Sequence, residues 1–168
     1  MRLTELLSPE RVGIETAAGA SGFDKERALS RLASMLGGGT HVAAADVEKV
    51  LAEREALQST GIGDGVAIPH GALQSLESQC AALLIVPEGV DFSAIDSQKV
   101  NILFAVIGPK RATGEHLKTL ARVSRLLRNR DFRDRLVAAE SPRAVFDMIS
   151  AEEGERPSLS GAAAEGKS

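Results

Sequence analysis

Two histidines and one arginine are the side chains of this 168-residue sequence that are best suited to chemistry. His70 lies in the segment Gly61-Ile-Gly-Asp-Gly-Val-Ala-Ile-Pro-His-Gly71. Because Pro69 fixes its own φ and pushes Ile68 towards extended geometry, a short strand is expected at residues 66–68. Gly71 lacks a Cβ, which allows unusual backbone angles or a close approach. This pattern predicts an imidazole on a stiff base beside open space, although a turn with an incidental histidine fits the local sequence equally well.

His116 and Arg54 are the residues that could help His70 to handle an anion. His116 is expected near the start of a helix, where unpaired backbone N–H groups favour negative charge. Arg54 precedes the glycine segment on another expected helix, and an arginine there is often a solvated surface residue. A phosphate acceptor needs a nucleophilic nitrogen together with cationic or N–H donors, and these three residues could supply them. Sequence spacing alone does not establish that they meet.

Other chemistries lack parts that they would need. Two histidines without a third ligand or an HExxH pattern make a weak metal site, so neither a metal nor a cofactor is expected. No Gly-x-Ser-x-Gly elbow supports a serine hydrolase. The glycines follow a helix and open a strand, and no Gly-Lys-Ser/Thr is present, so nucleotide binding is not expected.

The composition narrows the class of protein further. Aromatic residues make up 3% of the chain, with neither Trp nor Tyr, and the net charge is −3. Both features argue against nucleic-acid binding. The single cysteine, Cys80, is expected to be buried and inert, and His41 to be an exposed bystander. The start of the chain lacks a signal-peptide core and no apolar stretch is long enough to cross a bilayer, so a cytoplasmic location without membrane insertion is expected.

The elements that must position these residues alternate between strand and helix. The apolar runs 80–86 and 100–107 are bounded by prolines or glycines and predict strands buried on both faces. Shorter strands are expected at 11–14 and 89–92. Helices are expected at 24–36, 44–59, 115–129, 131–140 and 142–151. The expected fold is a single α/β domain over residues 1–152, and the Gly-, Ala- and Ser-rich segment 153–168 is expected to be a disordered tail.

Helical spacing also predicts which side chains face inward. For the helix at 44–59 these are Val47, Val50, Leu51 and Leu57. For the helix at 115–129 they are Leu117, Leu120, Ala121, Ser124 and Leu127. A basic stripe on the second helix is expected to face solvent, with docking of an acidic partner as a secondary role; it comprises Lys118, Arg122, Arg125 and Asn129.

Several motifs together resemble one known family. These are Arg54-Glu55, Ser59-Thr60 with the glycine segment through His70-Gly71, Pro87-Glu-Gly-Val-Asp-Phe92, and His116-Leu-Lys-Thr-Leu-Ala121. They are similar to the signature of phosphotransferase-system EIIA domains of the fructose/mannitol/nitrogen-regulatory type, over roughly residues 3–151. The resemblance implies a mixed β-sheet flanked by helices on both faces. It also implies that His70 and His116 lie close together.

What the resemblance implies for function is a phosphohistidine carrier. The histidine that matches His70 accepts a phosphoryl group from an HPr-like or NPr-like carrier, His116 helps to hold that group, and Arg54 offsets its charge. The length and the Leu6-Leu-Ser-Pro9 opening favour the nitrogen-regulatory branch, whose members act on regulatory target proteins. The alternative is a stand-alone EIIA of sugar uptake that passes phosphate to an EIIB partner. One departure from the family pattern is Ser97, where a glycine is expected after Asp96.

Overall fold

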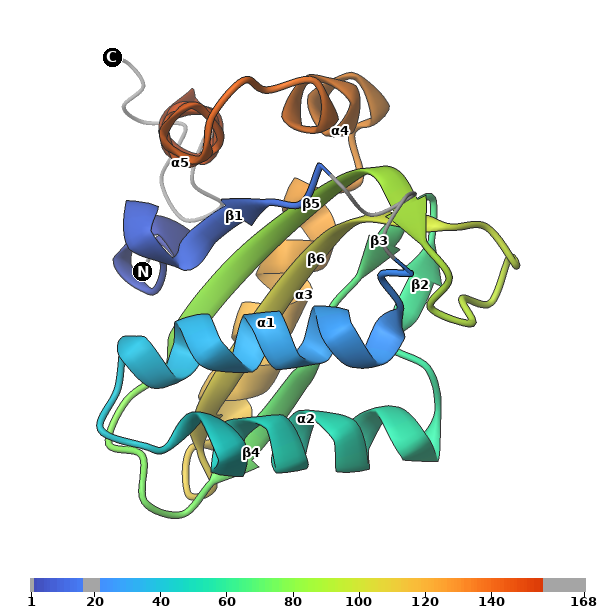
Figure 1. Cartoon of the computed structure of the whole chain (residues 1–168). Coiled ribbons are helices and arrows are strands. Elements are labelled where there is room, and N and C mark those ends of the chain that lie inside the picture. The colour runs from blue at the N-terminus through green and yellow to red at the C-terminus, as the bar shows by residue number, and fades with distance from the viewer. Residues whose placement is uncertain (1, 17–21, 156–168) are drawn as a thin grey trace.

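One mixed β-sheet lies between two layers of helices in the computed structural model, which describes residues 2–16 and 22–155 (Figure 1). In chain order the strands are β1 (Val12–Ile14), β2 (Gly61–Gly63), β3 (Val66–Ala67), β4 (His70–Leu73), β5 (Cys80–Val90) and β6 (Val100–Pro109). The helices are α1 (Lys25–Gly38), α2 (Ala44–Leu57), α3 (Thr113–Leu126), α4 (Arg130–Val137) and α5 (Pro142–Glu155). Short 3-10 turns, η1 (Leu3–Glu5) and η2 (Pro9–Arg11), precede β1. The predicted α/β class and the mixed sheet with helices on both faces are confirmed.

The two long apolar runs form the centre of the sheet. β5 and β6 are antiparallel, with Leu83 opposite Phe104. β1 lies parallel to β5 at one edge, and β3 and β4 both lie parallel to β6 on its other side. Side chains that alternate along these strands enter two separate cores, with Leu84 and Leu103 on one face and Leu83 and Phe104 on the other. The prediction that both strands are buried on two faces is confirmed.

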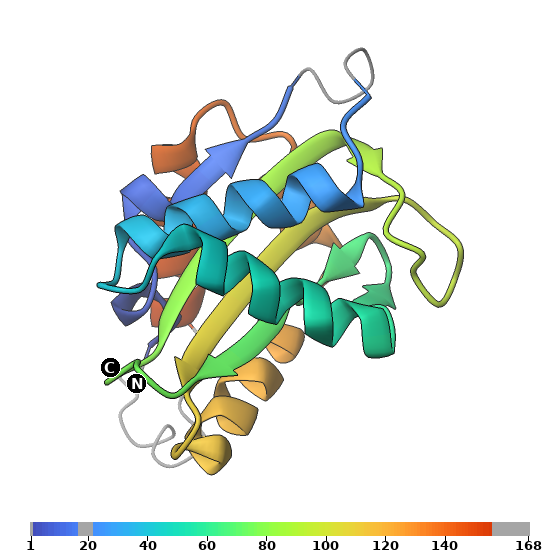
Figure 2. The same ribbon diagram turned by 60° about the horizontal axis from the view of Figure 1, so that its bottom comes forward.

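α1 and α2 pack side by side over one face of the sheet, as both views show (Figures 1 and 2). The Asp24 side chain accepts a hydrogen bond from Arg27 N, so it caps α1 as predicted. α1 ends at Gly38, within the glycine run that was expected to stop it. α2 buries Val47 and Leu51 as predicted, but Leu57 is 82% exposed. The prediction for Leu57 is wrong because α2 ends at that residue and Gln58 is already extended.

α3, α4 and α5 cover the opposite face of the sheet together with η1. The predicted inner stripe of α3 is partly wrong, since Leu117 is 59% exposed and Ala121 is also exposed. The buried residues of α3 are His116, Thr119, Val123 and Leu126, and Leu127 at its C-terminal end is buried as predicted. His116 and Thr119 are polar but face inward, so the spacing of the apolar residues alone predicts the wrong buried face for α3. The basic stripe of α3 faces solvent as predicted.

Two further differences concern element boundaries. Residues 89 and 90 extend β5 instead of forming a separate strand, because the Asn101 side chain donates to the carbonyl oxygens of Val86 and Pro87 and bridges the irregular stretch. α5 continues to Glu155, past its expected end near residue 151. The Glu153 carboxylate accepts hydrogen bonds from Leu3 N and Thr4 N and so ties α5 to the start of the chain. The remainder of the expected tail, 156–168, lies outside the described residues.

Candidate functional site

His70 stands at an interruption in the strand that runs beside β6. β3 pairs Ala67 with Leu103, and β4 resumes with His70 opposite Val106. Between them Pro69 has no N–H to donate, while its carbonyl accepts from Val106 N at 3.0 Å. The predicted strand at 66–68 is present as β3, and the same line of backbone continues through His70 as β4. The histidine is therefore fixed to the central strand of the sheet on a stiff base.

The carbonyl group of Ile68, at this interruption, fixes which nitrogen of His70 carries a proton. His70 Nδ1 lies 2.7 Å from the carbonyl oxygen of Ile68. A carbonyl oxygen can only accept, so Nδ1 must be the donor in this contact. In the neutral ring the lone pair is then on Nε2. The backbone thus leaves the lone pair of this half-buried imidazole on one defined nitrogen, Nε2.

The residue after His70 is a glycine because α2 packs directly against the backbone at that point. A Cβ on Gly71 would collide with Cγ1 of Val50. Gly71 is absent from the residues with positive φ. Of the two roles expected for Gly71, the structure therefore supports close approach rather than an unusual backbone angle.

His116 lies next to His70, with the ring centroids 5.7 Å apart and the planes inclined at 53°. β4 and β6 are parallel, so His70 lies near the end of β6 at Pro109. α3 begins four residues later and turns back over the sheet, which carries His116 to the same place. His116 is only 9% exposed, and Gly108 leaves room for its ring. The structure thus brings together the two histidines whose proximity spacing could not establish.

Both imidazoles are biased towards the neutral form. Burial lowers the pKa of His70, and the charge of Arg54 lowers it further, against the raising effect of the Ile68 carbonyl. Burial, with the neighbouring His70, also lowers the pKa of His116. At neutral pH the uncharged form of both rings is therefore favoured, and an uncharged imidazole has a nitrogen lone pair that is available for reaction.

Arg54 supplies positive charge beside the histidines without a direct hydrogen bond to either ring among the described residues. Its Nη1 donates to the carbonyl oxygen of Gln58 at 2.8 Å, which ties the side chain to the end of α2. The side chain is half-buried, and its charge lowers the pKa of His70. An arginine guanidinium has five N–H donors, and the contact with Gln58 uses one of them.

Glu55, next to Arg54, holds the loop that leads to the histidine strand. Its buried carboxylate accepts from Thr60 N and Thr60 Oγ1, at 3.0 and 2.6 Å, and from Lys25 Nζ at 2.7 Å. Thr60 O then accepts from Ile68 N, and Ile68 O accepts from His70 Nδ1. A chain of hydrogen bonds therefore runs from the start of α1 to the imidazole. Sequence reasoning included Glu55 and Thr60 in a motif but gave them no role.

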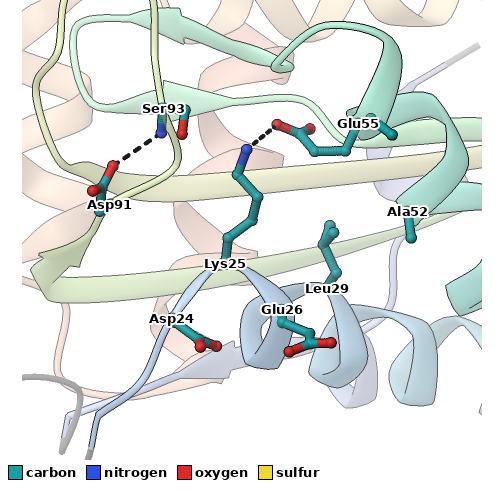
Figure 3. Close-up of a pocket in the computed structure, with 9 residues that line it drawn as sticks. Asp24, Lys25, Glu26, Leu29, Ala52, Glu55, Asp91 and Ser93 are labelled. Atoms are coloured by element: carbon teal, nitrogen blue, oxygen red, sulfur yellow. Dashed lines mark hydrogen bonds and ion pairs between the residues drawn. The ribbon is translucent and has the colours of Figure 1, made fainter.

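The Lys25–Glu55 pair lies inside a pocket of about 580 Å³ between α1, α2 and the segment after β5 (Figure 3). Lys25 reaches across the pocket to Glu55, and Lys25 Nζ also lies 4.9 Å from the ring centroid of Phe92. Asp91 on the opposite side accepts from Ser93 N. The pocket thus exposes the far end of the hydrogen-bond chain that supports His70.

The glycines of the motif shape a tight hairpin between β2 and β3. Gly63, Asp64 and Gly65 all have positive φ, which glycine adopts without strain. The Asp96 side chain accepts from Asp64 N at 3.0 Å and binds the hairpin to the loop before β6. Ser97, the departure from the family pattern, has φ +62° and so occupies the left-handed conformation that a glycine favours.

Exposed apolar side chains lie on the helices that carry His116 and Arg54 and on the hairpin that precedes His70 with its neighbouring loop. Leu117 directly follows His116, and Leu57 comes one turn after Arg54; Ile62 and Ile95 lie on the hairpin and on the neighbouring loop. Exposed apolar groups near a polar site are typical of surfaces that bind other proteins.

Other candidate residues stand apart from this site. His41 is exposed, and its Nε2 donates to the Ser75 carbonyl oxygen at 2.9 Å. Cys80 is buried, and burial raises the pKa of its thiol. In residues 2–16 and 22–155 no three His, Cys, Asp or Glu side chains gather as a metal-ligand group. None of the helices in these ranges combines the length and apolar character needed to span a bilayer.

Comparison with known proteins gives a consistent set of relatives. A family model described as "Phosphoenolpyruvate-dependent sugar phosphotransferase system, EIIA 2" matches residues 9–152. A nitrogen regulatory protein of Bradyrhizobium diazoefficiens is 34% identical over 150 residues, which cover 89% of this chain and 95% of that protein. The fructose-specific EIIABC component of Bacillus subtilis is 32% identical over 152 residues, which cover 89% of this chain and 23% of that protein.

The structural comparison agrees. The crystal structure of nitrogen regulatory protein IIA-Ntr from Neisseria meningitidis superposes with a TM-score of 0.79 at 29% identity, covering 88% of this chain and 98% of that one. A mixed sheet with a paired-histidine site at its edge, together with these matches, defines a phosphotransferase component. The chain belongs to the EIIA type 2 family of the phosphoenolpyruvate-dependent sugar phosphotransferase system. Within that family it has nitrogen-regulatory relatives along most of its length.

Proposed function

We propose that His70 is the phosphoryl acceptor and that it reacts through Nε2. The observation that carries this assignment is the hydrogen bond from Nδ1 to the Ile68 carbonyl, which leaves the lone pair on Nε2. In the transfer, that lone pair forms a bond to phosphorus while the bond from phosphorus to the donor's imidazole nitrogen breaks. The electron pair of the broken bond stays with the donor ring. His70 then carries the phosphoryl group until a second acceptor attacks it.

His116 and Arg54 stabilise the transferred group in this proposal. The ring centroids of His116 and His70 are 5.7 Å apart, so the His116 ring lies close enough to donate a hydrogen bond to an oxygen of a phosphoryl group carried by His70. Arg54 already acts on His70 electrostatically and keeps donors that are free for those oxygens. Phosphoryl transfer is catalysed mainly by such positioning and charge stabilisation.

The donor in this proposal is an HPr-like or NPr-like carrier, and the surface around the histidines supports docking of a protein. Leu117 and Leu57 provide exposed apolar contacts beside His116 and Arg54, and the basic stripe of α3 suits an acidic partner. A cytoplasmic location follows from this role, since the phosphoenolpyruvate in the family description is a cytoplasmic metabolite.

Regulation is the output that the relatives favour. The Bradyrhizobium nitrogen regulatory protein matches along 95% of its own length, whereas the fructose-specific protein continues far beyond the matched part. In the proposed role, phosphorylation adds up to two negative charges at His70 and changes which regulatory target binds. The second candidate is transfer to an EIIB domain in sugar uptake, because the Bacillus relative is named for A, B and C components in one chain.

Phosphorylation from a defined donor tests the assignment. Incubation with phosphoenolpyruvate, enzyme I and a phosphocarrier protein is expected to label the wild-type chain and to leave His70→Ala unlabelled. His41→Ala is the matched control, because His41 is an exposed histidine away from the site, and it should be labelled like wild type. Label that persists in His70→Ala would contradict the proposal.

A further inference from the structure

Two buried polar atoms near the site have no hydrogen-bond partner among the described residues. One is Nδ1 of His116 and the other is Oε1 of Gln79. The two residues are 9% and 8% exposed. A buried polar atom without a partner destabilises the fold, so two of them in one place require an explanation.

Both atoms belong to side chains that pack against the same glycine. A Cβ on Gly108 would lie 3.2 Å from Nδ1 of His116 and 3.2 Å from Cγ of Gln79. Gln79 directly precedes β5, and the first residue of β5, Cys80, pairs with Ile107 beside Gly108. Both side chains therefore lie against the side of Gly108 that a Cβ would occupy.

The loop that contains Gln79 is hydrogen-bonded to the loop that precedes α3. Arg111 donates through Nη1 to the Leu76 carbonyl at 3.1 Å and through Nη2 to the Glu77 carbonyl at 3.4 Å. Lys110 N donates to Leu73 O at 3.3 Å. Because both loops are held together, Gln79 is presented to His116 by a fixed backbone.

We propose that Gln79 is a positioning residue whose carboxamide NH₂ donates to Nδ1 of His116 and keeps the ring proton on Nε2. A carboxamide exchanges its donor and its acceptor when it rotates by about 180° around its last torsion, and the terminal sp³–sp² torsion is soft. This rotation replaces the unpartnered Oε1 with a donor aimed at the unpartnered Nδ1. One hydrogen bond then satisfies the imidazole nitrogen and removes the buried oxygen from its apolar position.

The proposed bond gives His116 the tautomer that its role needs. A proton on Nε2 can be donated to a phosphoryl oxygen on His70, whereas a ring protonated only on Nδ1 would point a lone pair at that oxygen. This consequence rests on the function proposed above for His116, but the tautomer itself does not. Outer partners that fix the tautomer of metal-bound histidines typically change affinity or activity by about 10- to 100-fold, and an effect at the lower end of this range is expected here.

Nitrogen-15 NMR of the imidazole rings in the unphosphorylated protein tests the tautomer directly. At neutral pH, wild-type His116 is expected to carry its proton predominantly on Nε2. If wild-type His116 carries it on Nδ1, the proposal is overturned, whatever happens to phosphorylation of His70. This readout uses the wild-type chain alone, so it does not depend on the folding of any variant.

Two substitutions separate positioning from packing. Gln79→Met keeps the length but removes the donor, so the Nε2–H form should lose its excess and phosphoryl acceptance should slow about tenfold. Gln79→Glu offers only acceptors when ionised and should shift the proton to Nδ1. Gln74→Met is the matched control, because Gln74 is an exposed glutamine in the same loop. It should leave both the tautomer and the rate unchanged. A tautomer that does not respond to either Gln79 substitution would overturn the proposal.

Discussion

At the scale of the single residue, the hydrogen bond from His70 Nδ1 to the Ile68 carbonyl fixes the orientation and the tautomer of the His70 ring. A histidine in a mobile loop would sample both tautomers, whereas this ring is bonded to a backbone oxygen at a break between two strands. Burial and Arg54 then keep the ring neutral. The result is one nitrogen, Nε2, with an available lone pair and a fixed orientation, as the proposed nucleophile needs.

The pH dependence of phosphoryl acceptance should reflect the lowered pKa of His70. Only the neutral ring attacks, so acceptance should be maximal above that pKa and should fall as the pH drops through it, at a pH below the ordinary value of 6.5.

Arg54→Met removes the charge that lowers the pKa, so the pKa should rise while acceptance at pH 7.5 falls about 100-fold. NMR titration of the His70 ring and single-turnover transfer measure the two effects. A pKa that falls in Arg54→Met would contradict this account.

Ser97 is a local departure from the family pattern with a measurable cost. Its φ of +62° is unfavourable for a residue with a Cβ. Ser97→Gly should therefore stabilise the fold by about 0.5–1 kcal/mol in chemical denaturation. Ser78→Gly serves as the control, because Ser78 is exposed and has no positive φ, and it should give no stabilisation. Equal effects of the two substitutions would rule out backbone strain at Ser97.

At the scale of elements, the packing of α2 on β4 sets the position of the histidine strand. Gly71→Ala places a methyl group against Val50 and should destabilise the fold by about 2 kcal/mol. Val50→Ala removes the obstructing methyl, so the double variant should recover part of that loss. Thermal unfolding of the wild type, the two single variants and the double variant gives a double-mutant cycle that measures the interaction between the two residues. Purely additive effects would show that the two residues do not interact.

The Glu55 cluster links α1, α2 and the loop before β2. Burial alone would raise the pKa of Glu55, but hydrogen bonds from Lys25 and Thr60 outweigh burial and lower it. A carboxyl whose pKa is lower in the folded state stabilises the fold above its unfolded pKa and loses that contribution as the pH falls through the folded value.

Glu55→Gln should accordingly cost about 2 kcal/mol at pH 7. The difference from wild type should shrink as the pH falls below 4.5, the ordinary value for this carboxyl. Glu53→Gln, an exposed change on the same helix, should show neither effect. Denaturation curves at several pH values provide the measurement, and a pH-independent difference would refute the ionised pair.

At the scale of the whole molecule, the sequence predicted the sheet better than the site. The runs 80–86 and 100–107 are apolar at nearly every position, so their burial on both faces could be read directly. The buried face of α3 could not be read from the sequence in this way, because the polar residues His116 and Thr119 occupy inward positions. Proximity of the two histidines depends on the parallel pairing of β4 with β6, which spacing does not encode. No sequence pattern indicated a role for Gln79, because Gln79 and His116 pack against the same glycine only in the folded chain.

The central claim is that phosphate resides on Nε2 of His70. One measurement tests it most directly: ¹⁵N–³¹P coupling in the protein phosphorylated by its carrier, with the ring assigned through His70→Ala. The account predicts a single phosphohistidine, on His70, with phosphorus coupled to Nε2 while Nδ1 keeps its proton against Ile68. Phosphorus on Nδ1 of His70, or on any other residue, would contradict it.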